Sequence, residues 1–120
     1  MVIHDSDDSG ALRSGHPRFY EMTQEEIELH DRKNHDYARG GDPLGNFYRV
    51  GKILALYLNL NPSDPRIVAM TYALKQLDAV LWMISGGYEG DVEGIDDRLR
   101  DVHVYMKLAR ILNEELNNAN

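Results

Sequence analysis

The stretch of residues 66–85 constrains the fold more than any other part of the chain. Ser63 or Asp64, followed by Pro65, predicts the start of a helix that spans this stretch. The apolar residues of this helix occur almost all round its surface instead of on one face, which is typical of a central, buried helix. They are Ile67, Val68, Met70, Leu74, Leu77, Val80, Leu81, Met83 and Ile84. A helix of this kind needs neighbours on several sides.

Three more helices are predicted to supply those neighbours. A capping box of Thr23 and Glu26 predicts a first helix that ends near residue 37. Asp42-Pro43 is typical of the N-cap and first residue of a second helix, and residues 95–115 form the fourth. No stretch alternates apolar and polar residues with β-branched enrichment, so no strand is predicted. The fold class is therefore all-α, a compact four-helix bundle-like domain. The aromatic residues Tyr48, Tyr57, Tyr72 and Trp82 are expected in its core and not on a base-stacking surface.

Length and composition limit the classes of function. With 120 residues the chain is expected to hold one domain over residues 19–116, after a flexible arm (1–18) and before a polar tail (117–120). It has no cysteine, which excludes a thiolate nucleophile and cysteine-ligated zinc. No secretory signal or uncharged 18-residue apolar run occurs, so we expect a cytoplasmic protein with no membrane partner.

The net charge bears on the class of partner. A formal charge of −7 disfavours a nucleic-acid polymer as partner. It leaves small phosphorylated ligands possible where a divalent cation mediates.

The predicted first helix carries an unusual polar stripe. Ile27 shares its arc with Glu26, His30, Asn34 and Tyr37, and Lys33 stands at the edge. Polar groups on an inward face need partners or a ligand, since their desolvation is otherwise unfavourable. Two interpretations remain open: a loosely docked surface helix, or a helix that lines a polar cleft.

Carboxylates on the third and fourth helices also have alternative interpretations. Asp78 lies on an apolar stripe, so its carboxyl group either pairs with Lys75, is protonated or binds a metal. Asp97 and Asp101 are four residues apart, so they either carry charge favourable to a helix N-terminus or share a hard cation. Carboxylates without thiolates suit Mg²⁺ or Mn²⁺, and lysines with a tyrosine hydroxyl suit phosphate oxygens. The glycine pairs at 40–41 and 86–87 are too weak a pattern to indicate a dinucleotide loop.

A family resemblance gives these residues a common context. RKNHDYARGGDPLGNF, residues 32–47, resembles the K-N-x-D-Y-(G/A)…D-P-(hydrophobic)-x-N-F signature of small helical phage and prophage proteins. These are the nucleotide-modification-associated domains and related MazG-like proteins. NFYRVGKILALY, ALKQLDAVLW and DDRLRDVHVYMKLAR are similar to later segments of the same proteins, so the resemblance covers about residues 24–112.

The resemblance implies a nucleotide-directed function. These families are similar to all-α nucleoside triphosphate pyrophosphatases, which hold Mg²⁺ with acidic residues and cleave between the α- and β-phosphates. The candidate catalytic residues are Asp97, Asp101 and Glu26, and the candidate metal ligands are Asp78, Asp97 and Asp101. The candidate ligand- or phosphate-binding residues are His30, Lys33, Asn34, Asp36, Tyr37, Lys75 and Tyr105. Of these, the resemblance matches Asp97 and Asp101 to acidic positions of the fourth helix, and Lys33, Asn34, Asp36 and Tyr37 to the first motif. Glu26, His30, Lys75 and Asp78 are candidates because of the helical faces on which they lie.

The chain departs from the pyrophosphatase pattern in two places. The early E-E-x-x-E is not intact, because Glu25-Glu26 is followed by Leu29 where a glutamate would stand. The later E-x-x-D is here Lys75-x-x-Asp78.

Three functions therefore stay open. The first is a Mg²⁺-dependent nucleotide pyrophosphohydrolase, and the second is a non-catalytic relative that binds or sequesters a nucleotide-derived signal, as an anti-defence protein would. The third is a purely structural helical oligomer. Under all three, the apolar excess on the third and fourth helices predicts a homodimer or higher homo-oligomer. In the pyrophosphatase superfamily such dimers make composite sites from two chains. A phage origin, and so a host cytoplasm, follows from the resemblance alone.

Overall fold

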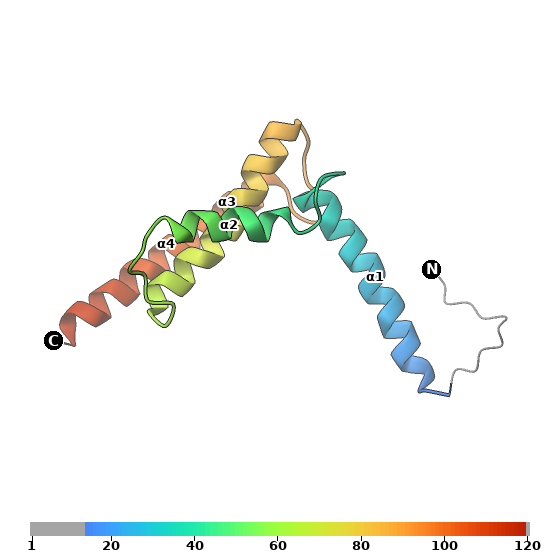
Figure 1. Ribbon diagram of the computed structural model, residues 1–120, viewed down its shortest axis with the longest axis horizontal. Helices are drawn as coiled ribbons and strands as arrows, with labels where there is room; N and C mark the ends of the chain where they lie inside the picture. Colours follow the sequence, from blue (N-terminus) through green and yellow to red (C-terminus); the bar gives the residue numbers. More distant parts are fainter. Residues whose placement is uncertain (1–13, 120) are drawn as a thin grey trace.

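The computed structural model describes residues 14–119, and these form four α-helices and no strand (Figure 1). The all-α fold class is confirmed. The predicted arm over residues 1–18 lies mostly outside the described residues, and its last two positions already belong to a helix. The helices are α1 Pro17–Tyr37, α2 Gly45–Ala55, α3 Pro65–Gly86 and α4 Ile95–Asn118.

The helix boundaries follow local capping chemistry, and two predicted starts are wrong. The His16 side chain accepts from the Arg18 N–H at 3.0 Å, so α1 begins six residues before the predicted capping box. Thr23 lies inside α1, where its hydroxyl donates to the Phe19 carbonyl at 2.9 Å. Asp42 accepts from the Leu44 N–H in the turn before α2, and α2 itself begins at Gly45.

The predicted start of α3 is confirmed at its cap. Asp64 accepts from the Arg66 N–H at 2.9 Å, and Pro65 is the first residue of the helix. The helix ends at Gly86 and is capped by Gly87, whose φ of +73° is the left-handed conformation that glycine adopts without strain.

The helices do not form the compact bundle that was predicted. α3 and α4 pack antiparallel along their lengths and α2 lies against α3 (Figure 1). α1 contacts α3, and its last turn also reaches Arg98 of α4. α1 therefore projects from the other three helices, and the molecule measures 64 × 37 × 26 Å. The physical reason is the polar surface of α1, which offers few apolar side chains to bury.

The buried core is small and contains charged residues. Its apolar members are Ala38, Ala69, Ala73, Ala79, Val80 and Met83. The largest fully buried side chains are Arg98, Met83 and Asp36, so two of the three are charged. Many large apolar side chains are exposed, among them Tyr48, Tyr57 and Tyr72, so their predicted place in the core is wrong. Alanines on α3 let α4 approach closely, but they bury little apolar area.

α3 is the one helix of the described residues that is long and apolar enough to cross a membrane, by length and composition alone. Because α3 contains Arg66, Lys75 and Asp78, it is not an uncharged apolar run. About a third of the most apolar 18-residue stretch of α3 is buried inside the molecule. The central helix of a soluble protein passes the same test, so this evidence is weak.

Candidate functional site

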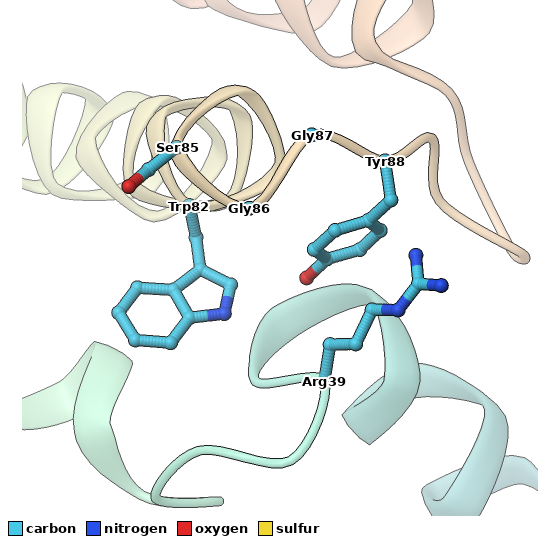
Figure 2. A pocket seen from close by; sticks show the side chains of 6 residues that line it. All are labelled: Arg39, Trp82, Ser85, Gly86, Gly87 and Tyr88. Atoms are coloured by element: carbon cyan, nitrogen blue, oxygen red, sulfur yellow. The ribbon is translucent and has the colours of Figure 1, made fainter.

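An open pocket lies where the end of α3 meets the loop that follows α1 (Figure 2). Its volume of about 350 Å³ is near the lower end of the size range of small-molecule sites. The lining residues are Arg39, Trp82, Ser85, Gly86, Gly87 and Tyr88. In Figure 2 the indole of Trp82 and the ring of Tyr88 stand on two sides of this space, and Arg39 reaches toward the Tyr88 ring from the α1 side.

Two guanidinium groups stack on the two aromatic rings. The Arg39 Cζ lies 4.3 Å from the centre of the Tyr88 ring, and the Arg49 Cζ lies 4.3 Å from that of Trp82. Arg39 has a φ of +37°, a left-handed conformation that is uncommon for a residue with a side chain. Residues held in this conformation are enriched at functional sites. Arg39 is the one cation among the lining residues, whereas Arg49 lies outside the lining and pairs with Asp78. The pocket thus combines one positive charge with two aromatic rings, on a chain whose net charge is −7.

One glycine of each glycine pair in the sequence lies close to an aromatic ring of this pocket. A Cβ on Gly41 would lie 2.9 Å from the Trp82 indole, and a Cβ on Gly86 would lie 2.8 Å from the Tyr88 ring. Glycine is therefore needed at both positions for the chain to pass so close to the aromatic side chains.

The aromatic side chains are also fastened to the end of α1. The Trp82 indole N–H donates to the Ala38 carbonyl at 2.9 Å. The Tyr88 hydroxyl donates to the Asp36 carbonyl at 2.8 Å. These two bonds satisfy polar groups of half-buried rings and fix their orientation.

Tyr88 makes a testable contribution to stability at high pH. Burial raises the pKa of its hydroxyl above the ordinary 10.0, and Asp36 adds to the rise while Arg39 and Arg98 oppose it. A tyrosine whose folded pKa is raised stabilises the protein below its unfolded pKa and loses that contribution as the pH rises through the folded pKa. We expect Tyr88→Phe to lower the free energy of unfolding by about 1 kcal/mol at neutral pH. This difference should shrink above about pH 10, measured by urea unfolding of both proteins across the alkaline range. A difference that does not change with pH would contradict this expectation.

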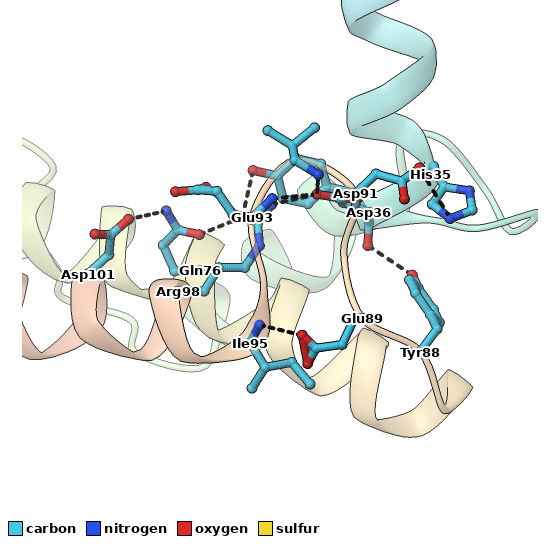
Figure 3. Close-up of polar contacts among 12 residues, drawn as sticks. His35, Asp36, Gln76, Tyr88, Glu89, Asp91, Glu93, Ile95, Arg98 and Asp101 are labelled. Atoms are coloured by element: carbon cyan, nitrogen blue, oxygen red, sulfur yellow. Dashed lines mark hydrogen bonds and ion pairs between the residues drawn. The ribbon is translucent and has the colours of Figure 1, made fainter.

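Behind the pocket, Asp36 holds the loop between α3 and α4 (Figure 3). Its carboxylate is fully buried and accepts hydrogen bonds from the backbone N–H groups of Asp91, Val92 at 2.8 Å and Glu93 at 3.2 Å. Three converging N–H groups stabilise a buried negative charge. Since Asp36 is closed off from solvent, it is not available to a ligand as the resemblance implied. Its role in the structure is to position the loop.

Arg98 is the cationic partner of Asp36. Its guanidinium is buried and lies 3.3 Å from the Asp36 carboxylate and 3.5 Å from that of Glu93. The same group donates to the Gln76 side-chain oxygen at 2.7 Å and to the Tyr37 hydroxyl at 3.2 Å. Its Nε has no hydrogen-bond partner among the described residues. The network thus ties α1, α3, α4 and the loop together through one charged centre.

Further predicted site residues lie at the edge of this network. Gln76 donates to the Asp101 carboxylate at 3.0 Å, so Asp101 is the outermost member. The Lys75 ammonium lies 5.6 Å from the centre of the Tyr37 ring. The structure therefore brings Asp36, Tyr37, Asp101 and Lys75 into one neighbourhood.

Other predicted site residues lie elsewhere. Glu26, His30 and Lys33 are exposed on the part of α1 that projects away from the other helices. Asn34 is half-buried, and its backbone carbonyl accepts from the Ala38 and Arg39 N–H groups. Asp97 is exposed beside Arg100, and Tyr105 packs edge-on against Tyr72. The predicted polar wall thus reaches the site only through its last turn.

The predicted ion pair between Lys75 and Asp78 is not formed. Asp78 instead accepts two hydrogen bonds from Arg49 on α2, at 2.7 and 2.8 Å. These bonds are the main cause that raises the pKa of Arg49, ahead of the opposing effect of burial. A planar guanidinium matches both carboxylate oxygens at once, which the single ammonium of Lys75 cannot do.

The candidate metal ligands are not placed as one shared set. Asp78 is engaged by Arg49 through both oxygens, Asp97 faces solvent, and Asp101 accepts from Gln76. Within residues 14–119, no three acidic or histidine side chains lie close enough to hold one ion. As placed, the described residues do not fit a Mg²⁺ or Mn²⁺ held by the protein alone.

The residues that build the pocket and its support were missed from the sequence. They are Arg39, Arg49, Trp82, Tyr88 and Arg98, and they come from α2, α3, α4 and the loops that follow α1 and α3. One signal was readable: Arg98 lies on the same helical arc as Ile95 and Val102, where a charged residue needs a buried partner. No family model, curated protein or solved structure matches the chain, so the site is interpreted from its geometry.

Proposed function

We propose that the protein binds a nucleotide or nucleotide-derived phosphorylated small molecule in the pocket at the end of α3. The observation that supports this most is an open pocket whose lining combines two aromatic rings, Trp82 and Tyr88, with the guanidinium of Arg39. An aromatic base has two faces on which such rings stack, and a guanidinium can bind phosphate oxygens through two parallel hydrogen bonds. The pocket's small volume favours a mononucleotide-sized ligand.

Each lining group has a role in this proposal. Trp82 and Tyr88 offer stacking surfaces for the base, and the exposed Arg39 offers its N–H groups to phosphate oxygens. The pocket also includes the C-terminal end of α3 at Ser85 and Gly86, where carbonyl oxygens carry partial negative charge. Such carbonyls accept from amino or hydroxyl groups and disfavour phosphate. We therefore place the base and sugar toward α3 and the phosphates toward Arg39.

Binding without hydrolysis is the form of this proposal that the residues favour. Hydrolysis of a phosphoanhydride needs a group to orient water and cations to balance the phosphate charge. Asp78, Asp97 and Asp101 each have a separate environment in the described residues, so they do not form that centre. A pyrophosphohydrolase is the alternative, in which Mg²⁺ would arrive with the nucleotide.

The proposal is tested by a thermal-shift panel of mononucleotides, cyclic nucleotides and nucleotide-sugars, each with and without Mg²⁺. A bound ligand raises the free energy of unfolding by RT ln(1 + [L]/Kd), and the thermal midpoint rises with it. Chromatography of each hit then shows whether the ligand is recovered intact, as we expect, or consumed, as the hydrolase alternative requires. A panel without any shift would contradict the proposal and favour the purely structural oligomer.

A pair of arginine variants locates the site. We expect Arg39→Gln to weaken binding of a hit about 10-fold, since one charged contact to phosphate contributes roughly 1.4 kcal/mol. Arg32→Gln is the matched control, because Arg32 is exposed on α1 and does not line the pocket. Isothermal titration of both variants gives the two dissociation constants. If both variants weakened ligand binding equally, or if neither did, the ligand would bind elsewhere.

A further inference from the structure

α3 carries a second organised surface, which the ligand pocket does not use. Six apolar residues follow each other at alternating intervals of three and four positions: Ile67, Met70, Leu74, Leu77, Leu81 and Ile84. This is the a/d repeat of a coiled-coil seam, sustained over about 26 Å of helix. We call these six residues the α3 seam.

The α3 seam is only partly covered by the rest of the chain. Leu81 is 65% exposed and Ile84 is 60% exposed, although both are large and apolar. Toward the other end, an apolar groove of about 400 Å³ runs along the seam between α2 and α4. Val102 and Met106 of α4 line the same groove, so the open apolar surface continues from one helix to the next.

The positions that flank the α3 seam do not oppose self-association. Within residues 67–84 the positions beside the seam, e and g of the heptad, are Thr71 and Asp78 on one side and Ala73 and Val80 on the other. Asp78 is the single charged member, and Arg49 pairs with it. Two copies of the seam can therefore meet without like charges facing each other, despite the net charge of −7.

One copy of the chain also lacks the core that its length requires. The buried apolar residues of the described part are three alanines of α3, Ala38, Val80 and Met83. Burying alanines yields much less hydrophobic free energy than burying leucines or isoleucines, and here the larger side chains are the ones left open. The exposed large apolar side chains of the chain itself could supply the apolar area that the core lacks.

We propose that the α3 seam is the interface between two copies of this chain, in which α3 and α4 of one copy pack against α3 and α4 of the other. A helical seam with a 3–4 repeat fits a helix with the same repeat, and the chain supplies one. A twofold-related pair covers Leu81 and Ile84 in both copies at once. This inference does not depend on the proposed ligand.

The oligomeric state of the full chain tests this inference. We expect sedimentation velocity to give a mass of at least twice the chain's 13.7 kDa. Leu81→Glu places a charge in the seam and should raise the dissociation constant roughly 100-fold or more. Leu58→Glu is the control, since Leu58 is 91% exposed in the loop after α2 and lies outside the seam. A monomeric parent, or a Leu81→Glu variant with the parent's mass, would overturn the inference.

A second measurement covers the case in which Leu81→Glu fails to fold. The thermal midpoint of an associated protein rises with protein concentration, whereas that of a monomer does not. We expect the parent's midpoint to rise over a roughly 100-fold range of concentration. A constant midpoint would overturn the inference without any variant. The ligand proposal has its own readout, so failure of either one leaves the other standing.

Discussion

Replacing Asp36 by asparagine is expected to cause the largest loss of stability of any single conservative change in this chain. Asparagine has almost the same size as aspartate, but it carries no charge. It also presents an NH₂ group to at least one of the backbone N–H donors of Asp91, Val92 and Glu93. We expect the free energy of unfolding to fall by about 3–5 kcal/mol, because Arg98 would stay buried with Glu93 as its only remaining carboxylate.

Urea unfolding followed by circular dichroism measures this loss. Asp31→Asn is the matched control, since Asp31 is an exposed aspartate on the same helix and should change stability by less than about 0.5 kcal/mol. Protease digestion adds a local readout, because release of the loop between α3 and α4 should make it the first site of cleavage. Equal stability of the two variants would show that the contacts of Asp36 do not hold the loop.

The helices could largely be predicted because their signals are local. Pro65 and Asp64 mark the start of α3 through the two or three residues beside them, and the structure uses them as predicted. α1 began earlier than predicted because His16, an uncommon cap, precedes Pro17. Thr23 has the spacing of a capping box, but its hydroxyl bonds back to Phe19 within the helix. A local pattern with two local solutions cannot be resolved without the neighbouring residues.

The site was harder to predict because its contacts are distant in sequence. Arg49 and Asp78 are 29 residues apart, and Asp36 and Arg98 are 62 apart. The sequence showed that Asp78 needs a partner, but the nearest cation along the helix, Lys75, was the wrong one. The motif at residues 32–47 singles out Asp36, which lies at the centre of the polar network. Its motif could not tell a ligand-binding carboxylate from one that positions a loop.

Arg49→Met is expected to cause the second largest loss in the free energy of unfolding. It removes the one ion pair between α2 and α3 among the described residues, and with it the stacking on Trp82. The Asp78 side chain is only 10% exposed and would keep its charge without a partner. Arg49 itself is partly exposed, so we expect a loss of about 2 kcal/mol in urea unfolding and not the full effect of a buried pair. Lys52→Met, at an exposed cation of the same helix, should change stability by less than about 0.5 kcal/mol.

A double variant separates loss of the ion pair from loss of packing. Asp78→Leu alone leaves Arg49 unpaired at a partly exposed site, and Arg49→Met with Asp78→Leu leaves neither charge behind. If the effect of Arg49→Met comes mainly from an unpaired Asp78 carboxylate, the double variant should be more stable than the sum of the single effects predicts, by about 1–2 kcal/mol. Additive losses would mean that Arg49 holds α2 through its packing on Trp82. In that case the pocket wall, and not the charge pair, would fix the position of α2, and Arg49→Met would also weaken ligand binding.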